Sequence, residues 1–320
     1  MYKRWIHATC CPDRNLPHST WRRWYGATKR TNAKLSRRCN LLTAKREVMS
    51  MYEGYFGLQR TPFSRDIPVH SLYLSRNHQE ALARLRYAAQ RRLVMLLIGD
   101  PGVGKSTVLR KLKHDLDAAA YEVLYLNQTG ATLRSFYADL LTQLRLDPPY
   151  STTKARTLVA KALLERYQTH HRTPVLLLDE AQEMPDELLA AVRGLLNYDC
   201  DAFSPFALVL VGTRRLAGRL ALQTHEALAG RVQLPFQLNP FTQEETGAYV
   251  QHQLNAAGAS RPIFTESALR RLHQQSNGNA RSINRTATLC LMSACLAKQE
   301  LIDDDLVAQI GAAELRGVAS

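Results

Sequence analysis

The chain has 320 residues, 45% of them hydrophobic, which is enough for one large or two ordinary domains around a sizeable core. No apolar run approaches the ~18 residues that cross a bilayer, and the first residues lack the continuous apolar stretch of a signal peptide. The six cysteines show no metal-ligand spacing and no C-x-x-C pair. These features argue against a disulfide scaffold and predict a cytoplasmic protein without membrane insertion.

The positive charge is concentrated at the start of the chain: the formal net charge is +14, and +10 of it falls within residues 1–50. This segment shows no helical or strand periodicity, so we predict that it is basic and flexible. Trp21 and Trp24 flank arginines there, a combination suited to phosphate contacts and base stacking. Alternatively, translation begins at Met49 or Met51, because the ordered pattern starts abruptly at that point.

Residues 99–106 have the spacing of a P-loop, between an apolar run at 93–98 that predicts a strand and a helical pattern at 107–113. Glycines let successive backbone N–H groups point at phosphate oxygens. The lysine of such a loop reaches the β and γ phosphates, and the serine hydroxyl holds Mg²⁺. We therefore predict a site for a nucleoside triphosphate with Mg²⁺ formed by Gly99, Asp100, Pro101, Gly102, Val103, Gly104, Lys105, Ser106 and Thr107.

Further apolar runs continue the pattern of strands and helices. Helical segments are predicted at 132–144 and 154–170, and Pro235 indicates that the last strand lies at a sheet edge. Strands separated by helices favour a doubly wound α/β layer, here a five-stranded parallel sheet with helices on both faces. Besides the run before the P-loop, the predicted strands are 122–127, 174–179, 206–212 and 232–238.

Two adjacent acids end the strand that follows the second helical segment. Asp179 and Glu180 come after four apolar residues and form a Walker B signature. Asp179 is expected to lie beside Mg²⁺ at the ligand edge of the sheet, and Glu180 to orient or deprotonate the attacking water. The alternative is an ordinary solvated strand end that happens to carry acids.

A polar residue, Thr213, follows the next apolar strand. Its position is suited to sensing the γ-phosphate or the attacking water, so we predict a catalytic role for it. The alternative is that Thr213 only caps the helix that follows.

The last part of the chain has a helical pattern throughout. Residues 276–279, Ser-Asn-Gly-Asn, break the pattern between the second and third segments. We predict a small all-helical lid domain at 239–320 beside a nucleotide-binding domain at 51–238. Its helices are expected at 244–258, 266–275, 280–298 and 303–315.

The order of these motifs resembles that of AAA+ ATPases. The sequences of the motifs are similar to those of the ExeA-like ATPases and of the TniB and TnsC transposition ATPases. The resemblance covers about 51–315 but not the basic segment. The two Walker motifs are general, whereas the later ones are more specific. The motifs that carry the resemblance are Met51–Leu58 with Pro62-Phe63 and Leu72-Tyr73, Asp179–Gln182, Val209–Thr213, Leu238–Phe241 with Glu245, Ile263–Thr265 and Gly278–Asn284.

The resemblance implies roles for two arginines. Arg281 falls where these ATPases have a sensor 2 arginine that reaches from the lid to the γ-phosphate. Arg231 falls where an arginine finger enters the site of a neighbouring subunit, which makes hydrolysis depend on assembly. Either could instead be a surface residue, and Arg215 and Arg219 are competitors for the finger.

The resemblance also implies the use of ATP, and no guanine-reading N-K-x-D motif follows Asp179. The first hypothesis is an ATP-hydrolysing homo-oligomer that engages double-stranded DNA and assists a transposase. An ExeA-like secretion ATPase is the alternative, although the sequence ends soon after the lid and the Gly212-Thr213 tip resembles the transposition group. A slow nucleotide-gated adaptor is a third possibility. Candidate DNA contacts, each explicable as a solvated helix face, are Arg84, Arg86, Arg91, Arg92, Lys111, Lys113, Arg134 and Lys154.

Overall fold

The chain divides into two compact units, Met1–Tyr55 and Phe56–Ser320. In the first unit, residues 52–55 are helical, and the basic segment predicted at 1–50 lies outside the described residues. Among the helices that the structure describes, none is both long and apolar enough to cross a membrane. The computed structural model describes the backbone of residues 52–127, 132–198 and 202–318, and side chains as far as Ala313.

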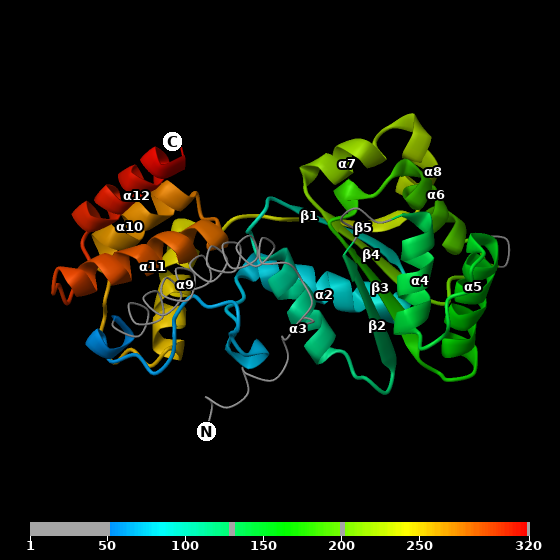
Figure 1. Cartoon of the computed structure of the whole chain (residues 1–320), viewed down its shortest axis with the longest axis horizontal. Coiled ribbons are helices and arrows are strands. Elements are labelled where there is room, and N and C mark those ends of the chain that lie inside the picture. The colour runs from blue at the N-terminus through cyan, green and yellow to red at the C-terminus, as the bar shows by residue number, and fades with distance from the viewer. Residues whose placement is uncertain (1–51, 128–131, 199–201, 319–320) are drawn as a thin grey trace, which may run out of the picture. The chain divides into compact units, whose positions relative to one another are not determined.

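The second unit contains a five-stranded parallel sheet with the order β2-β3-β4-β1-β5 (Figure 1). The predicted parallel sheet is confirmed, and β5, which contains Pro235, lies at its edge as expected. Since all strands are parallel, their carboxyl ends meet at one edge, which we call the carboxyl edge. The strands are β1 (Val94–Gly99), β2 (Tyr121–Asn127), β3 (Thr173–Asp179), β4 (Ala207–Gly212) and β5 (Val232–Leu238).

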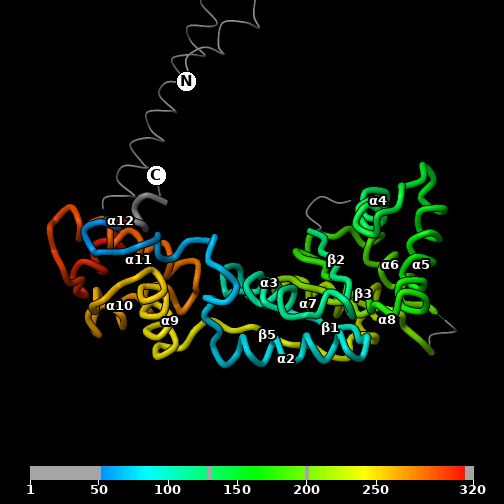
Figure 2. The backbone as a smooth tube through the Cα atoms, turned by 90° about the horizontal axis from the view of Figure 1, so that it is seen from below, coloured from blue at the N-terminus to red at the C-terminus, as the bar shows by residue number. Residues whose placement is uncertain are grey.

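Helices cover both faces of the sheet, as predicted. Strand side chains alternate between the faces, so Met95 and Leu97 pack under one helical layer while Leu96 packs under the other. One layer holds α2 (Arg76–Arg91), which runs along β1 and β5 in Figure 2, and α3 (Lys105–Asp115). The other layer holds α4 (Leu133–Gln143), α5 (Thr152–Gln168), α6 (Asp186–Leu195), α7 (Arg214–Leu220) and α8 (Glu226–Ala229).

Four helices follow β5 and form the C-terminal helical region, where α10 packs against α9, α11 and α12. The predicted break at 276–279 is present: Asn277 and Gly278 have φ of 48° and 70°. A Cβ on Gly278 would lie 2.0 Å from the Phe241 carbonyl oxygen, so only glycine fits there. The boundary between a lid and a nucleotide-binding domain stays a prediction. The helices are α9 (Gln243–Ala256), α10 (Glu266–Ser276), α11 (Ala280–Leu296) and α12 (Asp304–Val318).

Candidate functional site

The P-loop lies between the carboxyl end of β1 and the start of α3. Gly102 and Gly104 have φ of 92° and 107°, a backbone region that residues other than glycine rarely adopt. Gly104 is the N-cap residue of α3, so the first turn of this helix points its free N–H groups into the loop. These two glycines therefore give the loop the shape of a phosphate cradle.

The Lys105 ammonium group lies inside this loop. Its Nζ donates hydrogen bonds to the carbonyl oxygens of Gly99 at 2.7 Å and Asp100 at 3.1 Å, and the residue is only 7% exposed. Burial lowers the pKa of the Lys105 amine, whereas nearby acids, in the order Glu180, Asp179 and Asp100, raise it. The fold therefore brings the predicted P-loop lysine into electrostatic contact with both predicted Walker B acids.

The two acids at the carboxyl end of β3 have different surroundings. Asp179 is 4% exposed, and its Oδ2 accepts a hydrogen bond from the Tyr125 hydroxyl at 2.7 Å. Its Oδ1 accepts from the backbone N–H of Glu180 at 3.0 Å. Burial, followed by the bond to Asp179, raises the pKa of Tyr125, so this phenol remains a donor. Tyr125 was not predicted as a site residue, because it lies 54 residues before its partner in the sequence.

Glu180 turns away from the strand direction with a left-handed backbone, φ 54° and ψ 36°. Its Oε2 accepts a hydrogen bond from Gln182 Nε2 at 2.5 Å. The carboxylate of Glu180 is thus fixed at the carboxyl edge beside Lys105, where an attacking water would have to be held.

The donors at this edge fit Mg²⁺, a hard cation that takes oxygen ligands and keeps several waters. Ser106 is exposed in the first turn of α3, so its hydroxyl is accessible to a bound ion, and Asp179 supplies a buried carboxylate. Two oxygen donors of this kind, completed by phosphate oxygens and water, make the usual Mg²⁺ site of a P-loop protein.

The start of α11 touches the P-loop directly. Asn279 is the N-cap residue of α11 and donates from Nδ2 to the Pro101 carbonyl oxygen at 2.7 Å. The backbone N–H of Arg281 donates to the Gly102 carbonyl oxygen at 3.2 Å. The charge of Arg281 also acts to lower the pKa of Lys105, so its side chain lies near the site. The sequence analysis predicted a site role for Arg281, whereas Asn279 stood in the same motif without a role.

A buried histidine supports the P-loop from α2. His78 is 1% exposed, and its ring bonds to Ser75 Oγ at 2.7 Å and to the Val103 carbonyl oxygen at 3.0 Å. A Cβ on Gly104 would lie 2.4 Å from His78 Nε2, so the ring also requires glycine at that position. Sequence reasoning missed His78 because its partner in the P-loop, Val103, lies 25 residues later.

Thr213 occupies the N-cap position of α7, but its side chain makes no capping hydrogen bond. The capping alternative is therefore not supported, and the sensing role of Thr213 stays a prediction. The next residue, Arg214, was not singled out from the sequence, yet its Nε lies 3.5 Å from Asp100 Oδ1 of the P-loop. The start of α7 thus faces the P-loop.

The three candidate finger arginines differ in their contacts. Arg231 lies just before β5, at the amino edge of the sheet, and donates to the Arg193 carbonyl oxygen at 2.9 Å. Arg219 donates to two backbone carbonyl groups, of Gln182 and Met184, and pairs with Asp186. Arg215 is exposed and lies 3.5 Å from Glu183. The contacts described for these three arginines do not include Lys105. An arginine finger acts in the site of a neighbouring subunit, so a finger role for any of them stays a prediction.

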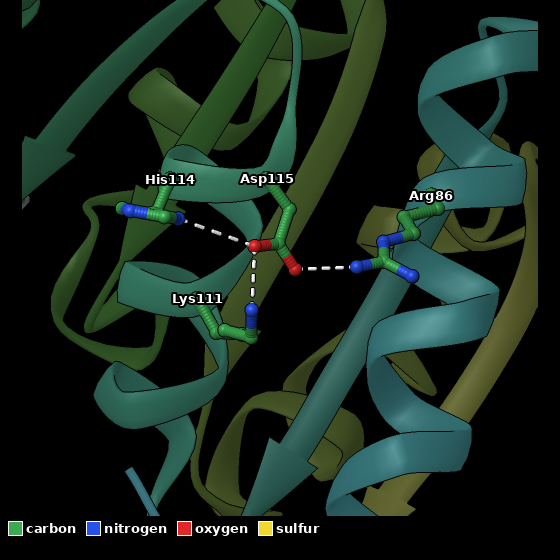
Figure 3. A network of polar contacts seen from close by, with 4 residues as sticks. All are labelled: Arg86, Lys111, His114 and Asp115. Atoms are coloured by element: carbon green, nitrogen blue, oxygen red, sulfur yellow. Dashed lines mark hydrogen bonds and ion pairs between the residues drawn. The ribbon is translucent and has the colours of Figure 1, made fainter. Parts of the chain in front are cut away.

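Several candidate DNA contacts are paired with acids instead. Figure 3 shows Arg86 of α2 and Lys111 of α3 pointing at Asp115, with Lys111 Nζ 2.6 Å from Oδ1. Burial raises the pKa of Asp115, but the hydrogen bonds from Lys111, His114 and Arg86 outweigh it and hold the pKa below its ordinary value. Arg84 pairs with Glu80 at 2.6 Å. Arg84, Arg86 and Lys111 therefore have a structural explanation.

Arg134 and Lys154 have a different setting, near the starts of α4 and α5. The Arg134 guanidinium stacks 4.4 Å from the ring centroid of Tyr150, a side chain that is 86% exposed. Beside it lies a groove of about 410 Å³ that contains no acidic residue. The groove is lined by Pro149, Thr153, Lys154, Thr157, Leu158 and Lys161.

Comparisons with known proteins agree with this geometry. Residues 87–220 match the family described as AAA domain. General secretion pathway protein A of Aeromonas hydrophila is 31% identical over 273 residues, which cover 84% of this chain and 49% of that protein. The chain therefore spans about half the length of this relative.

Solved structures share the fold at low identity. Cdc6p of Pyrobaculum aerophilum has a TM-score of 0.58 at 19% identity, over 75% of this chain and 67% of that one. The ORC1 protein of Aeropyrum pernix, solved in complex with DNA, has a TM-score of 0.58 at 17% identity, over 79% and 68%. The solved structures show the shared fold, while the family match and the sequence relative show that residues 87–220 form an AAA domain and that the chain is related to general secretion pathway protein A.

Proposed function

We propose that this chain binds ATP with Mg²⁺ and hydrolyses it at the carboxyl edge of the sheet. The observation that carries the proposal is the meeting of Lys105 with Asp179 and Glu180 around one glycine-rich loop. The P-loop spacing alone predicts phosphate binding, but a carboxylate placed to act on water is what hydrolysis needs in addition.

The residues divide the work as follows. Lys105 exchanges its two carbonyl partners for phosphate oxygens, which its short hydrogen bonds to Gly99 and Asp100 position it to do. Ser106 and Asp179 hold Mg²⁺, which supplies charge stabilisation to the phosphates when bound. Glu180 orients the attacking water and accepts its proton. The sensing contacts of Thr213 and Arg281 belong to this proposal.

Replacing Glu180 by glutamine tests hydrolysis separately from binding. The E180Q variant should keep ATP affinity within about threefold and lose roughly 10²- to 10⁴-fold in turnover, because a general base is removed. The matched control is E183Q, an exposed acid three residues along the chain. Wild-type turnover in E180Q, measured as phosphate release, would remove Glu180 from catalysis.

We further propose that the ATPase works as an oligomer on double-stranded DNA and assists a transposase, as TniB and TnsC proteins do. The exposed Tyr150 with Arg134 and Lys154 supports a nucleic-acid contact, since aromatic rings beside basic groups suit bases and phosphates. The fold is shared with an ORC1 protein solved with DNA, which is support by analogy. We extend the proposal to the cytoplasm, where both ATP and DNA are at hand.

The DNA part is tested by the ATPase rate with and without duplex DNA at low and moderate salt. We expect stimulation that weakens with salt, because phosphate contacts release counterions. It should be lost in the R134A/K154A double variant and kept in R84A, whose arginine pairs with Glu80. A chain beginning at Met51 shows whether the response needs residues 1–50. The absence of a DNA response in every form would contradict a DNA-engaging role.

The second candidate function is that of an ExeA-like secretion ATPase. It is favoured by the 31% identity to general secretion pathway protein A. An adjacent transposase gene would support the first candidate, and an adjacent secretion operon the second. If ATP binds but turnover stays very slow under all conditions, the chain acts as a nucleotide-gated adaptor.

A further inference from the structure

Gln182 makes two hydrogen bonds that join the ends of two neighbouring strands. Its Nε2 donates to Glu180 Oε2 at 2.5 Å, and its Oε1 accepts from the backbone N–H of Thr213 at 3.1 Å. One amide therefore connects the carboxylate that follows β3 to the backbone that follows β4. The bond to a carboxylate is charge-assisted and so stronger than one between neutral groups.

The surroundings of Gln182 leave its side chain little freedom. The residue is 6% exposed and lies in the short helix η2 (Ala181–Glu183). Its own carbonyl oxygen accepts a hydrogen bond from Arg219 Nη1 at 2.9 Å, which ties its backbone to α7. Gly212 adjoins it so closely that a Cβ there would lie 2.7 Å from Gln182 Oε1. The sheet end is thus shaped around this amide.

We propose that Gln182 is a positioning residue that fixes the Glu180 carboxylate relative to Thr213. The inference rests on the proposed function, in which Glu180 acts on water. A shift of the Thr213 backbone therefore moves Gln182, and with it the Glu180 carboxylate. In this way, contacts of Thr213 with the bound phosphate would set the orientation of the Glu180 carboxylate. Gln182 itself does not touch the phosphate or the water.

The chemistry of an amide explains why this position holds glutamine. A carboxylate at position 182 would accept from Thr213 N–H but would repel Glu180 across 2.5 Å. A methionine would fill a similar volume and bind neither partner. Only a side chain with a donor and an acceptor on one rigid group satisfies both neighbours.

The test uses the full chain with Q182M and Q182E, and Q233A as a matched control. Gln233 is an exposed glutamine near the amino end of β5. Both Q182 variants should lose roughly 10- to 100-fold in kcat with KM for ATP within about threefold, because misplacement of a catalytic group by about 1 Å costs on this order. Q182M should unfold near the wild-type temperature. Wild-type kcat in Q182M would overturn the inference, as would an equal loss in Q233A.

A double variant separates this inference from the proposed function. If Gln182 acts through Glu180, adding Q182M to E180Q should lower the residual rate no further, whereas independent roles would multiply. A further drop in the double variant would overturn the inference while leaving Glu180 in its role. Wild-type turnover in E180Q would instead overturn the proposed function, and then the inference falls with it. G212A, which displaces the amide without removing it, should reproduce the kcat loss of Q182M.

Discussion

The two edges of the sheet use charged side chains in different ways. At the carboxyl edge, Lys105 meets Asp179 and Glu180, and charges of both signs surround one loop. At the amino edge, arginines bind backbone carbonyl groups. Arg92 donates to the Ser204 carbonyl oxygen at 2.9 Å and lies 4.6 Å from the ring centroid of Tyr167. Arg231 donates to the carbonyl oxygen of Arg193.

This difference shows that the position of a charge relative to the strand ends is more informative than its residue type. Carbonyl groups at the ends of helices and strands need hydrogen-bond donors, and one guanidinium supplies several. Arginines near the amino edge therefore have a structural explanation. Opposite charges gathered around a glycine-rich loop have no such explanation. They mark a site whose ligand completes the arrangement.

Removing the lysine of the carboxyl edge should have the largest effect. Lys105→Ala deletes a charged donor to the phosphates, so ATP affinity should fall by roughly 100-fold or more and turnover should disappear. Binding of a fluorescent ATP analogue measures this directly. Lys113→Ala, an exposed change at the far end of α3, should bind normally. Unchanged affinity in the Lys105 variant would refute the P-loop assignment.

Arg231 is an exception to this comparison if it acts as an arginine finger, because a residue at the amino edge of one subunit would then act in the ATP site of a neighbouring subunit. Arg231→Ala should bind ATP normally but lose roughly 10³-fold in turnover. Mixing it with Lys105→Ala subunits should restore some activity, since mixed sites contain both groups.

The control for Arg231 is Arg92→Ala on the same edge. It should lower the melting temperature through lost packing on Tyr167 but keep turnover per folded molecule. If co-assembly is demonstrated and no mixture recovers activity, Arg231 is a structural residue like Arg92, and the contrast between the edges is complete.

A smaller effect is expected from Tyr125→Phe, which leaves all charges at the carboxyl edge in place. The change removes the 2.7 Å bond that orients Asp179. Groups that orient a metal ligand contribute about 10- to 100-fold to metal affinity, so half-maximal activity should require roughly tenfold more Mg²⁺. Tyr121→Phe, at the other end of β2, is the control. Equal Mg²⁺ dependence of the two variants would show that Asp179 needs no orienting partner.

The elements and residues that sequence reasoning found are those with local signals. The strand at 232–238 was predicted at its true bounds because apolar residues lie between clear breaks, and Lys105 and Asp179 stand in short motifs. The bounds of helix α2 were not predicted, although Ser75 caps it, its apolar residues recur at helical spacing, and its arginines were read as a solvated helix face.

The missed site residues depend on contacts that only the fold creates. Tyr125 meets Asp179 across 54 residues, and Asn279 meets the P-loop across 178. No spacing rule connects such pairs, because they follow from strand order and from the placement of α11. Gln182 and Thr213 each stood in a predicted motif, but the hydrogen bond between them could not be predicted from the sequence.

The smallest effect concerns His78, which binds a carbonyl group at the carboxyl edge without a charge. Burial lowers the pKa of the His78 imidazole, although the bond to Val103 and the charge of Glu245 act against this. The folded chain therefore binds fewer protons than the unfolded chain once the pH falls below about 6.5, and stability is lost as the pH falls further. His78→Gln keeps a donor for Val103 but cannot titrate, so its melting temperature should decline less between pH 7 and pH 5. The exposed His170→Gln is the control. If wild type and His78→Gln decline in parallel, His78 does not carry this pH dependence.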